Sequence, residues 1–322
     1  MKRVYLDQAE WIELTRARLG KPTSAGVREV LDIARAGVPL GLVALPLSGI
    51  HYMENAQTRR WSQRGALAAT MAELSCFATI APATRLLEAE LDQALRKMFG
   101  RPYEVRTIDV FGTGGAHAFG EPELADVQDP RLRALMDADP TLRPFIEKRR
   151  EFAMLAGPPR DFPLPWFPTE SVRQQEDRFA ATQRQVGATL REAGYGKDGR
   201  AVPTLVAQML VEILGPLNEA MARTGLSADL LYTPEALTDL LMDLPTQRVD
   251  YELRLALHRD SGLPWKGNDL DDIGALCLAV PYCDIVVTER KWRALVQATH
   301  LDKLYGTTML DSLDDLPALL VI

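Results

Sequence analysis

Short apolar runs typical of buried strands lie near both ends of this chain, and helical patterns follow them. The runs cover residues 3–6, 42–45, 285–288 and 307–310. Strands that alternate with helices are joined by crossover connections, which give a parallel sheet with helices packed on its faces. The two ends of the chain therefore predict one α/β domain.

The middle of the chain, residues 81–245, has a different pattern. Apolar residues recur there mostly at helical spacing, and the predicted helices are 86–99, 147–155, 171–192, 204–224 and 234–242. Three loop-like stretches separate them, at 112–122, 157–168 and 194–199. No repeat period is evident, which disfavours a solenoid. We predict a discontinuous α/β domain of residues 1–80 and 246–322 with a mostly helical insertion of residues 81–245.

The charge balance limits the partners that the surface can attract. Acidic residues outnumber basic residues by 44 to 37, which argues against a broad surface for nucleic acid or anionic membrane but leaves room for a local basic groove. The longest apolar stretch, residues 38–50, is shorter than the ~20 residues of a membrane-spanning helix. Asp7 and Glu10 interrupt the N-terminus before a secretion signal can develop. We expect a cytoplasmic protein with no membrane partner.

Acidic residues lie near the ends of the predicted strands. Asp7 follows the first strand, and Glu289 follows the third. Glu54 lies within about two turns of the second strand, on a helix whose predicted N-cap is Ser48. The carboxyl ends of parallel strands are the usual ligand site of an α/β sheet. Carboxylates gathered there repel one another unless cations lie between them, and their hard oxygen atoms suit Mg²⁺ or Mn²⁺.

Other acids have structural explanations beside the metal-binding one. Asp269, Asp271 and Asp272 lie at the start of a predicted helix, where acids cap backbone N–H groups and favour the helix dipole. Asp271 faces a different direction from Asp272 and suits solvent. Asp284 directly precedes the third strand and suits a turn. Asp7 is harder to explain in this way, because packing gives little reason for an acid at the end of a buried strand.

Four segments together resemble the PIN-like nucleases: YLDQAEW, LPLSGIHYMEN, GNDLDDIGALCLAVPYCDIVVTERKW and YGTTMLDSLDDL. The resemblance covers only the two ends of the chain and implies a three-layer α/β/α domain with a central parallel sheet. In that family an acid ends the first strand and a glutamate follows the second. An aspartate then opens a helix that leads to a strand ending in a hydroxyl residue and a further acid. Asp7, Glu54, Asp272 and Thr288 occupy the first four of these places.

The resemblance leaves two ligand assignments open. Asp269 is an additional acid at the matching helix start, and it shares or assumes the role of Asp272. The fourth acid usually lies two residues after the strand-ending hydroxyl, where this chain has Arg290, so it is either Glu289 or Asp284. The insertion is also larger than a minimal domain of this kind requires, so no substrate is transferred from the resemblance.

The implied chemistry is hydrolysis of phosphodiester bonds with one or two Mg²⁺ or Mn²⁺ ions. The metal-ligand candidates are Asp7, Glu54, Asp269, Asp272, Asp284 and Glu289. The catalytic candidates are Asp7, Glu54, Asp269, Asp272 and Thr288. Bound metal would activate and orient a water molecule and stabilise charge on the phosphate. Cleavage of this kind would leave a 5′-phosphate and a 3′-hydroxyl.

Basic residues cluster beside the expected metal site and are candidates for substrate binding. They are Arg59, Arg60 and Arg64 after Glu54, and Arg290 and Lys291 after Thr288. Phosphate binding depends on Lys and Arg, and single strands stack on aromatic residues such as the neighbouring Trp61 and Trp292. Ser48 is a further candidate contact to phosphate. Each basic cluster is equally compatible with a solvated helix face that carries a packed tryptophan.

Three functions are compatible with these patterns. The favoured one is a metal-dependent endoribonuclease that acts on single-stranded RNA, in a bacterial toxin or defence role. The alternative is a catalytically inactive PIN-like protein that binds a protein partner, or a second copy of itself, through the helical insertion. A phosphatase of the haloacid dehalogenase kind is disfavoured, because the second acid that it needs would stand where this chain has Ala9.

Overall fold

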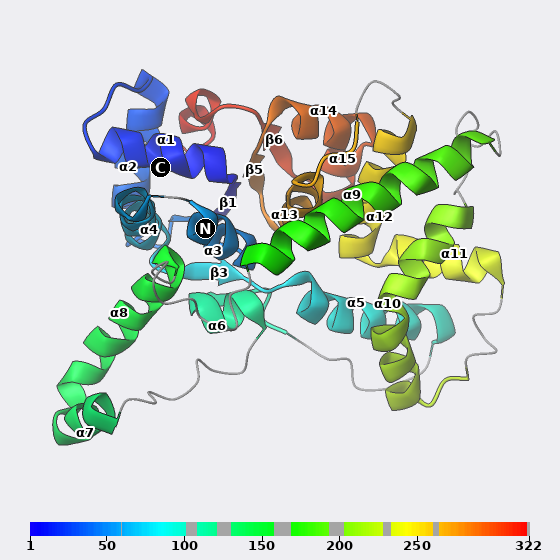
Figure 1. The fold of residues 1–322 in the computed structure, drawn as a ribbon, viewed down its shortest axis with the longest axis horizontal. Helices are drawn as coiled ribbons and strands as arrows, with labels where there is room; N and C mark the ends of the chain where they lie inside the picture. Colours follow the sequence, from blue (N-terminus) through cyan, green and yellow to red (C-terminus); the bar gives the residue numbers. More distant parts are fainter. Residues whose placement is uncertain are drawn as a thin grey trace.

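The computed structural model contains a four-stranded parallel sheet in the order β2-β1-β5-β6 (Figure 1). It describes residues 1–58, 60–100, 108–120, 130–157, 169–192, 203–227, 233–259 and 264–320. The strands are β1 (Lys2–Leu6), β2 (Val43–Ala44), β5 (Ile285–Val287) and β6 (Thr308–Leu310). All four predicted strands are present, and the prediction of a mixed α/β fold with a parallel sheet is confirmed.

Strand β1 lies inside the sheet because both of its edges are paired. Val4 pairs with Ile285 on β5, and the other edge of β1 pairs with β2. Successive side chains of a strand point to opposite faces of the sheet. Val4 and Leu6 accordingly pack in one apolar core, whereas Tyr5 packs in another. Both faces of the sheet are therefore buried.

Helices from distant parts of the sequence cover the two faces. The face of Val4 packs against α1 (Gln8–Arg18), α2 (Ala25–Gly37), α3 (Gly49–Gln57), α4 (Trp61–Ser75) and α8 (Arg143–Ala156). The face of Tyr5 packs against α5 (Ala83–Phe99), α9 (Thr169–Glu192), α12 (Pro245–Arg259), α13 (Asp269–Tyr282), α14 (Arg290–Ala298) and α15 (Leu301–Tyr305). Trp11 and Trp292 are fully buried, one in each core. The two cores hold the ends of the chain together around the sheet.

The middle segment packs on the sheet domain and also forms a third core. Its remaining longer helices are α7 (Pro130–Ala138), α10 (Pro203–Thr224) and α11 (Pro234–Asp243). Leu91 on α5 and Leu240 on α11 belong to an apolar core that α10 and α12 complete. Helices α7 and α8 extend from the opposite side of the molecule (Figure 1). The predicted boundaries fall at the end of β3 (Ala78–Ile80) and at the start of α12.

The predicted loop at residues 112–122 is wrong for the part that the structure describes. Residues Phe111–Thr113 form β4, which pairs antiparallel with β3, and Gly114–Phe119 form α6. A Cβ atom on Gly112 would lie 2.5 Å from Cδ2 of His117. The glycine therefore allows close packing against His117. From the sequence alone, the many glycines of this segment indicate a flexible loop.

Two other expectations, on membrane helices and on loops, and the state of the cysteines concern the same structure. No described helix is long and apolar enough to cross a membrane. The three cysteines are free, with Cys277 and Cys283 buried and Cys76 exposed. Residues 158–168 and 194–199, which cover the other two predicted loops apart from Gly157, lie outside the described residues.

Candidate functional site

Asp7 lies at the carboxyl end of β1, where the chain enters α1. Its Oδ1 accepts a hydrogen bond from the N–H of Gln8 at 2.7 Å, so Asp7 caps the helix. Its Oδ2 accepts from the hydroxyl of Thr288 at 3.3 Å, and its N–H donates to the carbonyl of Val287 at 3.0 Å. Burial raises the pKa of Asp7, the two hydrogen bonds to its carboxylate lower it, and the charge of Glu289 raises it. The structure thus brings Asp7 and Thr288 together.

Glu54, on α3, is the most strongly perturbed acid of this region. Burial, followed by the charges of Asp7, Asp271 and Asp272, raises its pKa to about 9. The coupling arises because α3 is in contact with α13, which carries the two aspartates. An acid with this pKa holds its proton at neutral pH unless a cation offsets the repulsion. The structure therefore places Glu54 within the electrostatic reach of the acids with which the sequence grouped it.

Asp272 lies in the first turn of α13. Burial, and then the charge of Asp7, raises its pKa to about 7, and the charges of Glu289 and Asp269 act in the same direction. The indole N–H of Trp292 lowers this pKa, although the buried N–H has no partner at normal hydrogen-bond geometry among the described residues. The nearby indole N–H thus favours the charged form of Asp272, although the two groups do not form a hydrogen bond of normal geometry.

Asp269 is engaged differently from the other acids. Its side chain is 1% exposed, and its Oδ1 accepts a hydrogen bond from Nζ of Lys291 at 2.6 Å. Its Oδ2 accepts from the N–H of Lys266 at 2.8 Å. The Lys291 ammonium also lies 4.0 Å from the ring centre of Trp292. Both oxygens of Asp269 are therefore occupied, and in this structure the residue holds Lys291 in place.

The two candidates for the fourth acid lie at opposite ends of β5. Glu289 follows the strand, is exposed, and raises the pKa of Asp7 and Asp272. Asp284 precedes the strand, and its Oδ2 accepts a hydrogen bond from the N–H of Arg3 at 2.7 Å. Arg3 lies near the start of β1, whereas Asp7 follows its end. The structure therefore corrects the assignment of Asp284 as a metal ligand, whereas Glu289 lies at the same end of the sheet as Asp7.

Three further acids, Glu10, Asp271 and Glu176, lie around this set, and the sequence analysis did not assign them to the site. Burial and the charge of Asp7 raise the pKa of Glu10 to about 8, and its buried Oε2 has no hydrogen-bond partner in the described part of the chain. Burial and Glu176 on α9 raise the pKa of Asp271 to about 6, so the prediction that Asp271 is solvated is wrong. Glu10 follows Asp7 by three positions, a spacing that could have revealed it, whereas nothing in the sequence linked Glu176 to the site.

Two of the predicted substrate contacts are buried structural residues. Ser48 is fully buried, its Oγ lies 2.9 Å from the hydroxyl of Tyr5, and its N–H donates to Nδ1 of His51 at 2.9 Å. Arg64 is 5% exposed, and its Nε donates to the carbonyl of Thr58 at 2.6 Å. These contacts stabilise the start of α3 and the connection to α4. The structure therefore corrects the assignment of both residues as substrate contacts.

The other predicted cations have different surroundings. Arg290 is exposed in the first turn of α14, beside Glu289, and the side chain of Lys291 is 23% exposed. Arg60 is exposed at the N-cap of α4. Arg59 lies outside the described residues. Arg290 and Lys291 thus lie next to acids of the site, Arg290 beside Glu289 in the chain and Lys291 against Asp269.

The acids suit a divalent cation in their chemistry but do not form a ready coordination shell. Their oxygen donors are those that Mg²⁺ and Mn²⁺ prefer, and burial followed by mutual repulsion raises the pKa values of Glu54 and Asp272. Among the described residues, no three His, Cys, Asp or Glu side chains are arranged to hold a metal ion. Coordination of one ion by three of these side chains would therefore require an arrangement different from the one described.

Comparison with known proteins identified no relative from which a function could be transferred. No protein-family model matches the sequence. No curated protein and no solved structure matches it. The function of this chain therefore has to be inferred from its residues and their geometry.

Proposed function

We propose that the protein is a metal-dependent nuclease that hydrolyses phosphodiester bonds of single-stranded RNA. The observation that carries the proposal is the electrostatic coupling of half-buried acids around Asp7 near the carboxyl ends of β1 and β5. Burial, and after it the charge of Asp7, raises the pKa of Glu10, Glu54 and Asp272, which lie on three different helices. Such repulsion is unfavourable unless protons or cations offset it. Divalent cations would offset it and would also be useful for phosphate chemistry.

Asp7, Glu54, Asp272 and Glu289 would hold one or two Mg²⁺ or Mn²⁺ ions. The bound metal would supply an activated water molecule and would stabilise charge on the phosphate. Glu54 holds a proton at neutral pH and would release it on binding, because only the carboxylate form is a ligand. The hydroxyl of Thr288 donates to Asp7 and would keep that carboxylate oriented.

Lys291 and Arg290 would contact the phosphate backbone of the substrate. Asp269 and the ring of Trp292 fix the Lys291 ammonium while its side chain stays partly exposed. The acids alone would repel phosphate, so these cations would act together with the bound metal. A net charge of −7 agrees with recognition at one site rather than over a broad surface. A toxin or defence role is part of the proposal, with the helical insertion available for a partner.

Cleavage of labelled single-stranded RNA, with single-stranded DNA beside it, tests this proposal. The purified protein is assayed with Mn²⁺, with Mg²⁺ and with EDTA, together with Asp7→Asn and Asp272→Asn. Asp284→Asn is the matched control, because it removes a carboxylate next to β5 at the opposite end of the strand. Circular dichroism shows that each variant is folded.

We expect metal-dependent cleavage of RNA that leaves a 5′-phosphate, and a loss of at least about 100-fold in rate in both site variants. Asp284→Asn should cleave at close to the wild-type rate. Cleavage that persists in EDTA, or in both site variants, would contradict the proposal. A wild-type protein that neither cleaves nor binds Mn²⁺ would favour the inactive interaction protein instead.

A further inference from the structure

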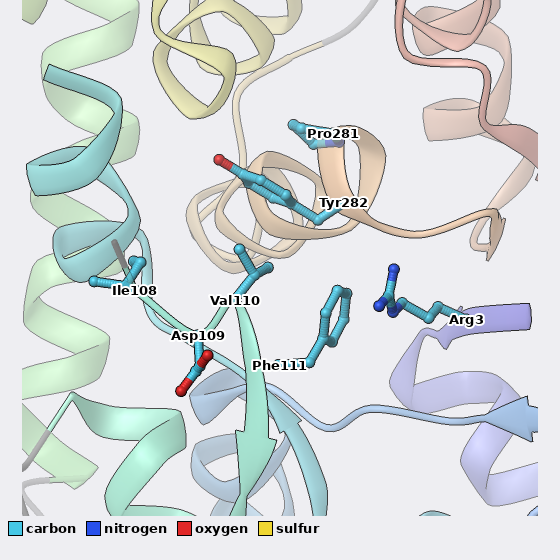
Figure 2. Close-up of a pocket in the computed structure, with 7 residues that line it drawn as sticks. All are labelled: Arg3, Ile108, Asp109, Val110, Phe111, Pro281 and Tyr282. Carbon is cyan, nitrogen blue, oxygen red and sulfur yellow. The ribbon is translucent and has the colours of Figure 1, made fainter. Parts of the chain in front are cut away.

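A pocket of about 460 Å³ lies at the amino end of β1 and β5, away from the acidic residues (Figure 2). Strand β1 supplies Arg3, the segment that enters β4 supplies Asp109, Val110 and Phe111, and the end of α13 supplies Tyr282. We propose that this pocket binds a nucleoside monophosphate, with the phosphate on Arg3. This site is independent of the proposed nuclease activity.

Arg3 provides an unused cation. Its guanidinium carbon lies 4.4 Å from the ring centre of Phe111, and Figure 2 shows the group beside that ring. Its Nε is buried and has no hydrogen-bond partner among the described residues. The nearby Asp284 accepts from the backbone N–H of Arg3 at 2.7 Å, and no ion pair joins the two side chains in the described part of the chain. The two terminal guanidinium nitrogens are not buried and have no hydrogen-bond partner among the described residues, so they are the donors that phosphate oxygens can reach with the fork of the arginine.

The walls of the pocket suit a flat, partly apolar body. Phe111, Val110 and Tyr282 surround the space between Arg3 and the opposite end of the pocket (Figure 2). The hydroxyl of Tyr282 donates to Oε1 of Glu90 at 2.6 Å, which fixes its ring. Rings and aliphatic side chains of this kind pack on the faces of nucleobases. The volume falls within the usual range of small-molecule sites, roughly 300–1,000 Å³.

Asp109 sets the character of the other end of the pocket. It is exposed, and Figure 2 shows it on the side away from Arg3. Its backbone carbonyl accepts from Nε2 of His117 at 2.9 Å, which anchors this part of the chain. The carboxylate can accept hydrogen bonds from ribose hydroxyls or from a base amino group. A ligand with an anion at one end, a flat body and donors at the other end matches the three parts of the site.

Calorimetric titration with adenosine 5′-monophosphate tests the proposal directly. The full chain is titrated in EDTA, so that no metal can bridge the nucleotide to the acidic residues. Arg3→Met and Phe111→Leu are the site variants, and Arg143→Met, an exposed arginine on α8, is the matched control. Adenosine and inorganic phosphate are titrated separately to distinguish the nucleoside part from the phosphate part. Circular dichroism checks the fold of each variant.

We expect saturable binding to the wild type and to Arg143→Met, and a loss of at least about tenfold in affinity in Arg3→Met. Phe111→Leu should weaken binding severalfold, as should removal of the phosphate or of the nucleoside. If Arg3→Met does not fold, Arg3→Lys keeps the charge, loses the fork and should still bind more weakly than the wild type. Absence of binding to the wild type, equal binding to Arg3→Met, or phosphate binding as tight as nucleotide binding would overturn the proposal.

Discussion

The two ends of strands β1 and β5 differ in charge: acidic side chains gather at the carboxyl end, and an arginine lies at the amino end. At the carboxyl end, half-buried acids surround Asp7, and desolvation together with the charge of Asp7 raises the pKa of Glu54 to about 9. At the amino end, Arg3 has a buried nitrogen without a partner among the described residues. Arg3 lies on β1 and Asp7 directly follows it, four residues away or roughly 13 Å at the rise of a strand. Two residues that are close in sequence can therefore belong to different sites when they lie at opposite ends of a strand.

The pair Glu289 and Asp284 is the sharpest test of this comparison, because the two acids flank the same strand. Glu289→Gln should lower the Mn²⁺-dependent cleavage rate by about 10-fold to 100-fold, since it removes a carboxylate that interacts with Asp7. Asp284→Asn should stay within about twofold of the wild type. Single-turnover rates over a range of Mn²⁺ concentrations measure both. A larger effect from Asp284→Asn would reverse the assignment of the two ends.

Glu54→Gln tests the repulsion at the carboxyl end without an activity assay. Between the ordinary pKa of glutamate and about 9, the folded protein keeps a proton that the unfolded chain releases, so wild-type stability falls as pH rises. Glutamine does not titrate, so in EDTA the stability of the variant relative to the wild type should increase between pH 5 and pH 8. The gain should reach about 4 kcal/mol in the free energy of unfolding, because each of the three pH units contributes about 1.4 kcal/mol.

Urea unfolding at several pH values measures this difference. In Mn²⁺ the wild type should become the more stable of the two proteins. Binding of the metal ion stabilises the wild type, whereas the variant lacks one of the carboxylates that would bind it. A difference between the two proteins that does not change from pH 5 to pH 8 would show that Glu54 is not held in a repulsive site.

Lys291→Met tests the cation that Asp269 positions. The variant should raise KM for RNA by about tenfold with little change in kcat, because Lys291 would bind the substrate backbone. Asp269→Asn should shift KM in the same direction, since it releases the ammonium that its carboxylate holds at 2.6 Å. Lys303→Met, an exposed lysine on α15, is the control. A loss in kcat alone, or loss of Mn²⁺ binding in Asp269→Asn, would make Asp269 a metal ligand instead.

Arg290→Gln should have the smallest effect. Arg290 is exposed, so the loss of its one phosphate contact should lower kcat/KM about twofold to threefold. The slope of log(kcat/KM) against log salt concentration should become shallower by about one. Steady-state kinetics at several salt concentrations measure the slope. An unchanged slope would place Arg290 outside the path of the substrate.

The fold was predictable from local patterns because the strands are short apolar runs with clear ends. Val4 and Leu6, for example, alternate with Tyr5 between two cores, as a strand buried on both faces requires. The segment around Gly112 was not predictable, because its glycine serves close contact with His117 across a turn. Packing of that kind depends on tertiary contacts that local composition does not encode.

The candidate site was predictable only in part. Strand ends pointed to Asp7, and the structure adds that this residue also caps α1, a structural role that spacing did not reveal. Asp269 and Asp272 are equivalent in sequence, yet only Asp269 meets Lys291, which lies on another helix. Ser48 is on the expected helix start but faces the core. Side-chain partners brought in by other elements decide such roles, so the sequence cannot assign them alone.

Calorimetric titration of the metal-free protein with Mn²⁺ tests the central claim most directly, because it needs no knowledge of the substrate. The account predicts saturable binding that Asp7→Asn weakens by at least about tenfold and that Asp284→Asn leaves unchanged. A wild-type protein that binds no Mn²⁺, or an affinity that Asp284→Asn lowers as much as Asp7→Asn does, would contradict it.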